Sequence, residues 1–161
     1  MKSKRGSMLD ILFIIVVLFV LSFSIYLSTN LYFSVASSLN QSDSIGNTSK
    51  SIINNYGGKM TNIFDNTFVF VFIGLILAVG VGAFLIRSHP AFFFISLGLL
   101  VLFVMLGTIF SNLYGSVSSS SAFSPYVSSY VKMDYIMTHL PMLIVIAGIL
   151  IMIVMYAKNN L

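Results

Sequence analysis

Residues 68–110 read FVFVFIGLILAVGVGAFLIRSHPAFFFISLGLLVLFVMLGTIF, which is two long apolar runs joined by a short polar connection. The runs, Phe68–Ile86 and Ala91–Phe110, contain no charged residue. Each has about 20 residues, enough for a helix to cross the roughly 30 Å hydrocarbon core of a bilayer. Two further uncharged runs of similar character are Ile11–Leu27 and Leu140–Tyr156. The sequence therefore predicts an all-α integral membrane protein with four transmembrane helices.

The composition supports the bilayer as the solvent of this chain. Hydrophobic residues make up 58% and charged residues 7%, whereas a soluble domain has roughly 25% charged residues. There is no cysteine in the sequence, which excludes disulfides, thiolate metal sites and a cysteine nucleophile. The first 27 residues have the basic start of a secretory signal, but the apolar run is long and no small-residue cleavage site follows it. We expect an uncleaved anchor.

The charged residues predict the orientation of the spans. Four spans place both termini on one side of the membrane, together with five basic residues: Lys2, Lys4, Arg5, Arg87 and Lys158. Asp10 is the acid on that side, so its net charge is about +4, while lysines and aspartates balance on the other side. By the positive-inside rule, the termini are expected on the cytoplasmic or equivalent side. The predicted segments are inner 1–10, 87–90 and 157–161, outer 28–66 and 111–139, and spans 11–27, 67–86, 91–110 and 140–156.

The short inner connection predicts how the two middle spans pack. Residues 87–90 are too few to let the second and third spans separate, so we expect a tight antiparallel hairpin. On the second span Gly74, Ala78 and Gly82 recur every four residues, which places small side chains on one face where a neighbouring helix can approach closely. Gly98 on the third span is a matching candidate. The alternative is that glycine is simply common in membrane helices.

The first outer segment, 28–66, has a helical pattern of its own. Leu27, Leu31, Val35 and Leu39 repeat every four residues, which predicts that the first helix continues outward by about three turns. A returning helix is expected to begin near Lys59, after Gly57 and Gly58 break the chain, with a Ser/Asn-rich tip over 41–56. The predicted shape is a helical hairpin that protrudes outward. Its candidate partner contacts are Leu31, Val35, Leu39, Ile52, Ile53 and Tyr56.

The second outer segment, 111–139, is rich in serine and tyrosine, and its aromatic residues suit the interfacial belt of a membrane. A helical pattern begins at Lys132 and leads into the fourth span. Pro141 is expected either in the first turn of that span or at a kink just inside it.

The sequence offers no pattern typical of catalysis. No ionisable residue lies within a predicted span, there is no glutamate, and His89 and His139 fall on opposite sides of the bilayer. The serines are not accompanied by a G-x-S-x-G or S-x-x-K motif. Basic residues are spread along the chain rather than gathered in a nucleic-acid patch. We therefore expect a protein that is not an enzyme, with no catalytic, cofactor-binding or metal-binding residues and no specific nucleic-acid binding.

Several short segments resemble small multi-span membrane proteins of lipid-containing viruses and mobile elements of archaea and bacteria. They are residues 4–10, His89-Pro90, Phe92–Phe94, Ser111–Tyr114, Leu140-Pro141 and Tyr156–Lys158. The resemblance implies a component of a virion's internal membrane that shapes the lipid layer and links it to capsid proteins through its outer segments. It implies no catalytic residues.

Two other functions remain open at the level of the sequence. A holin-like pore or lysis protein also needs only a few spans and small-residue interfaces, and a membrane subunit of a secretion or conjugation apparatus has the same general features. In each case the expected partners are the lipid bilayer, other membrane or capsid proteins, and further copies of the chain.

Overall fold

The computed structural model describes residues 9–85 and 91–159, and these residues form six helices without a strand. The helices are α1 (Leu9–Gln41), α2 (Asn47–Leu85), α3 (Ala91–Ser118), α4 (Ser124–Val127), α5 (Val131–Thr138) and α6 (Leu140–Asn159). The predicted all-α class is confirmed.

Three helices, α1, α2 and α3, are each long and apolar enough to cross a membrane. The fourth predicted span is part of a broken pair, because α5 and α6 are bent by 70° at a break of one residue, His139. Pro141 lies in the first turn of α6, and Ser111 Oγ of α3 donates a hydrogen bond to the Thr138 carbonyl at the break (2.9 Å). Residues 9–85 and 91–159 therefore contain three candidate spans, or up to four if the bent pair counts as one. These apolar helices support an integral membrane protein.

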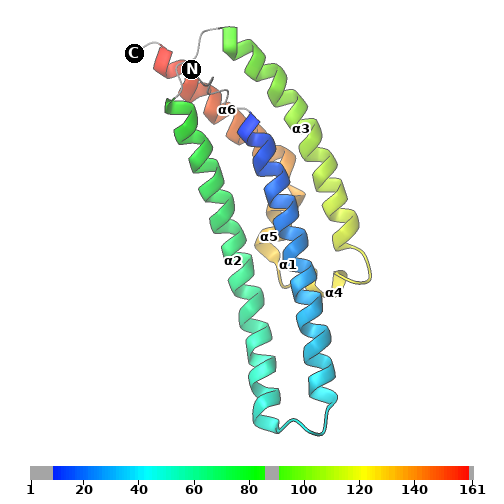
Figure 1. Cartoon of the computed structure of the whole chain (residues 1–161). Coiled ribbons are helices and arrows are strands. Elements are labelled where there is room, and N and C mark those ends of the chain that lie inside the picture. Colours follow the sequence, from blue (N-terminus) through cyan, green and yellow to red (C-terminus); the bar gives the residue numbers. More distant parts are fainter. Residues whose placement is uncertain (1–8, 86–90, 160–161) are drawn as a thin grey trace, which may run out of the picture.

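The helices α1 and α2 run side by side as an antiparallel hairpin that extends past the ends of the other helices (Figure 1). The start of α1, the end of α2, the start of α3 and the end of α6 gather at the opposite end of the molecule (Figure 1). Helix α6 packs against both α2 and α3, and α5 also contacts both.

The expected tight pairing of the second and third spans is not confirmed. The most extensive contacts are those of α3 with α6 and of α1 with α2, whereas α2 and α3 are not among the closely packed pairs. The connection 87–90 lies outside the described residues.

Two glycines explain why α3 packs closely against α6. A Cβ atom built on Gly107 of α3 would lie 2.3 Å from Ile144 Cδ1 of α6, and one built on Gly148 of α6 would lie 2.3 Å from Leu100 Cδ1 of α3. Each helix therefore places a large aliphatic side chain into a notch that a glycine leaves on the other. This reciprocal fit is the close approach that small residues permit between membrane helices.

The returning helix of the hairpin begins much earlier than the sequence suggests. The prediction of a start near Lys59 is wrong, because α2 begins at Asn47 and continues through Gly57 and Gly58 without interruption. The turn between α1 and α2 is only residues 42–46, so the predicted tip over 41–56 is mostly helix. Gly57 serves close packing instead, since a Cβ there would lie 3.1 Å from Phe33 Cε1 and 3.2 Å from Tyr32 Cε1 of α1.

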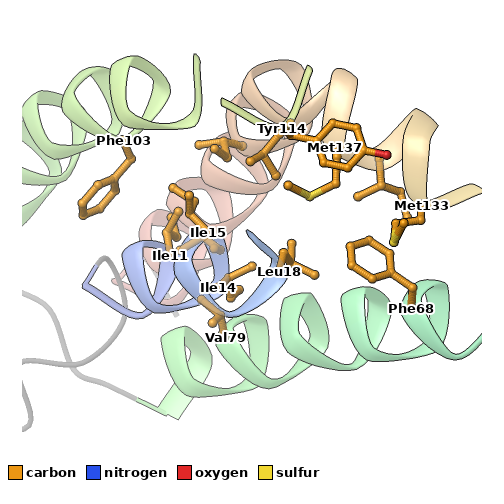
Figure 2. Close-up of a cluster of buried hydrophobic side chains, with 14 of the residues drawn as sticks. Ile11, Ile14, Ile15, Leu18, Phe68, Val79, Phe103, Tyr114, Met133 and Met137 are labelled. Atoms are coloured by element: carbon orange, nitrogen blue, oxygen red, sulfur yellow. The ribbon is translucent and has the colours of Figure 1, made fainter. Parts of the chain in front are cut away.

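The buried core draws apolar side chains from several helices. Figure 2 shows Ile15 and Leu18 of α1, Phe68 of α2, and Met133 and Met137 of α5 turned toward a common interior. All five are fully buried. The core continues along α1, α2, α3 and α6, and its part beside α5 lies next to the polar groups described below.

Candidate functional site

A chain of buried tyrosines joins α1, α3 and α5. The hydroxyls of Tyr26 and Tyr114 lie 2.7 Å apart, and Tyr114 donates to Asp134 Oδ1 at 3.1 Å. Because the single proton of the Tyr114 hydroxyl is used in that bond, Tyr26 is the donor to Tyr114. Both tyrosines are buried. The sequence places Tyr26 near the end of the first apolar run, and these bonds satisfy a hydroxyl that would be costly to bury unpaired.

A second pair of hydroxyls joins α1 to the start of α5. Thr29 Oγ1 donates to the carbonyl of Ile25 at 2.8 Å and is also hydrogen-bonded to the Tyr130 hydroxyl, which is therefore the donor in that pair. Tyr130 is fully buried, and its burial raises the pKa of the phenol above its ordinary value.

Asp65 of α2 caps the N-terminus of α5. Its Oδ1 accepts a hydrogen bond from the Met133 amide at 2.8 Å, and its Oδ2 accepts one from the Lys132 amide at 3.2 Å. The residue before α5, Tyr130, provides no side-chain cap of its own. A carboxylate at this position satisfies two free amides and is favoured by the positive end of the helix dipole. The Lys132 ammonium also donates to the side chain of Asn66.

Aromatic side chains attach the segment around α4 to α1. The rings of Phe33 and Tyr126 are stacked with centroids 5.3 Å apart, and those of Tyr26 and Phe123 with centroids 5.7 Å apart. Asn30 Nδ2 donates to the Ala122 carbonyl at 2.8 Å. The predicted Ser/Tyr-rich outer segment is therefore packed against the base of the hairpin.

Hydrogen bonds of five side chains form a network that joins the start of α5 to α1, α2 and α3: Tyr26, Thr29, Asp65, Tyr114 and Tyr130. Each hydroxyl of Tyr26, Tyr114 and Tyr130 is engaged with another side chain of the protein. His139 does not join them: it is exposed, stacks on Tyr135 and contacts the Tyr135 carbonyl through Nδ1. The arrangement fixes geometry by hydrogen bonds between helices that are distant in sequence.

The outer part of the hairpin has its own internal contacts. The Tyr32 hydroxyl donates to the Ile53 carbonyl at 2.6 Å, and Asn40 Nδ2 donates to Asn54 Oδ1 at 2.8 Å. These two hydrogen bonds, and the close approach that Gly57 allows, hold α1 and α2 together along the outer part of the hairpin.

Most of the predicted partner contacts are exposed on this hairpin. Leu31, Val35 and Leu39 are 65%, 57% and 37% exposed on α1, and Ile52 and Tyr56 are 59% and 66% exposed on α2. Ile53 differs, because it is half-buried on the side of α2 that faces α1. Sequence reasoning missed Ile63, which is 61% exposed and lies seven residues beyond Tyr56, two helical turns along the same face.

The predicted small-residue face has no partner among the residues that the structure describes. A Cβ atom at Gly74, Gly82 or Gly98 would meet nothing within 4 Å, and Ala78 is exposed. The predicted match between Gly98 and the second span is therefore not made within the described residues. Close approach of another helix to this face stays a prediction.

The topology determinants fall mostly outside the structure. Lys2, Lys4, Arg5 and Arg87 lie outside the described residues, and Lys158 lies in the last turn of α6.

No protein-family model, curated protein or solved structure matches the chain.

Sequence reasoning also missed the residues of the hydrogen-bond network around α5. In the sequence, Asp65 is one of the aspartates that balance the outer lysines, and Tyr26, Tyr114 and Tyr130 have the character of span or interfacial residues. A tyrosine inside or beside an apolar run was the available signal, since its hydroxyl requires a partner once buried.

Proposed function

We propose that this chain is a non-enzymatic structural protein of a membrane, and that its hairpin carries the contact with proteins outside the bilayer. The observation that carries the proposal is the length of α1 and α2, which have 33 and 39 residues. At 1.5 Å per residue they reach about 50 and 58 Å, against a hydrocarbon core of roughly 30 Å. With one end in the bilayer, about 20 Å or more of the hairpin projects from it.

The internal bonding of the hairpin supports a mechanical role. An isolated pair of helices would fray, but here tyrosine and asparagine bonds tie α1 to α2 along the outer part. At the base, the aromatic contacts of α4 and the Asp65 cap of α5 brace it from the side. A braced projection can hold a partner at a fixed distance from the lipid.

The resemblance to small viral membrane proteins suggests the setting. In that setting the chain belongs to the internal membrane of a virion. It shapes the lipid layer and links it to capsid proteins through the outer segments 28–66 and 111–139. The inner side would hold both termini and the turn between the second and third spans. The holin-like and secretion-subunit functions remain the alternatives that an experiment must separate.

Cross-linking at the hairpin tip tests this function directly. We would introduce Ser44→Cys in the turn, attach a photo-reactive maleimide, and irradiate purified lipid-containing particles. The expected result is a covalent adduct with a capsid protein. Ile73→Cys, exposed within the α2 span, is the matched control and should give lipid or membrane-protein adducts only.

The alternatives predict different outcomes. Absence of the chain from particles, with rapid loss of the host membrane potential on expression, would overturn the structural proposal in favour of a pore. Adducts with a secretion ATPase or its membrane partners would overturn it in favour of a secretion or conjugation apparatus.

A further inference from the structure

The exposed apolar residues of the outer hairpin lie on one face. Ala36 of α1 is buried and Gly57 of α2 lies against α1 rings, so these two positions mark the sides that face each other. At about 100° per residue, Leu31, Val35 and Leu39 lie roughly 60–140° from Ala36 in one rotational sense. Ile52, Tyr56 and Ile63 lie roughly 100–140° from Gly57 in the same sense. Because the helices are antiparallel, the same sense of rotation brings both sets to the same side of the hairpin.

This apolar face, made of Leu31, Val35, Leu39, Ile52, Tyr56 and Ile63, points away from the rest of the protein. Tyr26, Phe33 and Asp65, which bond to or stack on residues of α3, α4 and α5, lie on the opposite rotational side of α1 and α2. The other helices therefore cannot cover the apolar face.

The size of the face matches one side of a stable interface. The six side chains are between 37% and 66% exposed. Taking about 200 Å² for a fully exposed large apolar residue, they present on the order of 700 Å². A standard interface buries roughly 800 Å² on each partner. A water-exposed apolar patch of this size normally marks a protein contact.

The face continues into the predicted span of α2. Gly74 and Ala78 lie within roughly 60–100° of the Gly57 direction in the same rotational sense as Tyr56, and Gly74 has open space beside it. An occupant of the whole face must therefore cross the membrane and also project from it. Lipid cannot cover the outer half, and a soluble protein cannot reach Gly74. A second copy of this chain has the required length on both sides of the membrane surface.

We propose that this apolar face pairs with the same face of a second copy, so that two hairpins form a four-helix bundle outside the membrane. Copies inserted in the same direction can be related only by a two-fold axis along the membrane normal, which gives an isologous contact. The inference rests on the membrane insertion in the proposed function and not on the capsid contact. Pairing through this face leaves the turn 42–46 and the polar side of each hairpin free for other proteins.

The test measures dimerisation of the full chain in lipid vesicles by single-molecule photobleaching over a range of protein-to-lipid ratios. The wild type is expected to form dimers. The double variant Val35→Asp with Ile63→Asp places charges in the centre of the contact and should weaken dimerisation at least 100-fold. The matched control, Ser37→Asp with Ser51→Asp, adds the same charges at exposed positions on the other side of the same helices and should dimerise like the wild type.

Both variants change exposed side chains, and circular dichroism with thermal unfolding checks that each remains folded. A wild type that stays monomeric at every ratio would overturn the proposal, as would equal effects of the two double variants. The proposed pairing would also be overturned if the apolar face became shielded from solvent only when a different protein is added. Dimers in vesicles without a capsid adduct at Ser44→Cys would sink the proposed function and leave the pairing intact.

Discussion

Asp65 is a single side chain that connects two distant segments of the protein. It is 7% exposed, belongs to α2, and accepts from two amides in the first turn of α5. Such amides have no partner within their own helix, so a cap supplied by another helix fixes the position of α5 as well as stabilising it. Tyr130 adds the adjoining bond to Thr29 of α1.

Removing the cap should loosen α5. Asp65→Ala is expected to lower the free energy of unfolding by about 1–2 kcal/mol, the usual cost of losing an N-terminal cap. Amide hydrogen exchange over 131–138 should accelerate in that variant. Asp43→Ala removes the same charge from an exposed position in the turn and is the control. Equal exchange in α5 of the two variants would contradict the capping role.

The burial of Tyr130 predicts how the stability of the folded protein changes at alkaline pH. Its folded pKa is raised by burial, so the folded state keeps the phenol proton at a pH where the unfolded chain has lost it. Its contribution to stability is therefore complete below about pH 10, the ordinary tyrosine value, and is lost as the pH rises through the higher folded value. The wild type should be more stable than Tyr130→Phe at neutral pH by about 1 kcal/mol.

Denaturant unfolding in detergent, measured from neutral pH to about pH 11, checks this difference. The stability advantage over Tyr130→Phe should shrink only at the alkaline end. Tyr135→Phe changes an exposed tyrosine of α5 and serves as the control. An advantage that is constant with pH would contradict the expectation.

At the scale of the helices, glycine positions decide which elements pack together. Gly57 lets α2 approach the rings of Tyr32 and Phe33 on α1, and Gly107 and Gly148 create the notches between α3 and α6. Glycine costs about 1 kcal/mol relative to alanine inside a helix, and close packing at these sites offsets that cost. Gly58 is a neighbour with open space, so it has no such role.

The hairpin contact can be tested with adjacent glycines. Gly57→Leu should destabilise the protein by about 1–3 kcal/mol, because the larger side chain must displace the Phe33 and Tyr32 rings. Gly58→Leu should be neutral or stabilising, since leucine has the better helix propensity and a Cβ atom at this position meets nothing within 4 Å. Thermal unfolding of both variants in the same detergent measures the difference, and similar losses would mean that Gly57 acts through helix flexibility.

The pairing of α3 with α6 gives a parallel expectation. Gly148→Leu should be destabilising by about 1–3 kcal/mol because it collides with Leu100 of α3. Gly98→Leu changes a glycine of α3 that faces open space, so it should leave the unfolding temperature of the monomer within a few degrees of the wild type. The reverse order of effects would show that Gly98, rather than Gly148, lies in a helix contact.

At the scale of the molecule, the length of the hairpin and the grouping of helix ends define an orientation. The turn 42–46 lies at one extreme of the structure, and the ends of α2 and α6 lie at the other (Figure 1). If the spans cross a bilayer, these two regions are on opposite sides of it. The absence of cysteine from the sequence makes single-cysteine labelling unambiguous.

The proposed topology predicts which cysteines are reached from outside. In intact cells, Ser44→Cys should react with a membrane-impermeant maleimide, whereas Lys158→Cys should react only after permeabilisation. Ile73→Cys should remain unlabelled in both conditions, because the proposed topology places this exposed residue of α2 in the lipid. Labelling of Lys158→Cys from outside would reverse the orientation without changing the fold.

The amino-acid sequence by itself determined the all-α class of the protein and the approximate place of its long apolar helices. Apolar runs of about 20 residues can satisfy their backbone only as helices in lipid, so composition and length were sufficient. The Leu27, Leu31, Val35 and Leu39 repeat likewise indicated an extended first helix, because helical periodicity is a local property.

The tertiary structure alone decided which helices pack together and which polar groups meet. Gly74, Ala78 and Gly82 recur regularly on α2, yet within the described part of the chain Gly74 and Gly82 meet no neighbour, whereas Gly107 and Gly148 do. Local sequence also could not show that Gly57 lies inside a helix and packs against another one, because the rings that it contacts, Tyr32 and Phe33, belong to α1. The hydrogen bonds from Tyr26 to Tyr114 and from Tyr114 to Asp134 join segments far apart in the chain, as do those that Asp65 accepts from the first amides of α5. Their pairing depends on how the helices cross, which is set by packing summed over the whole bundle.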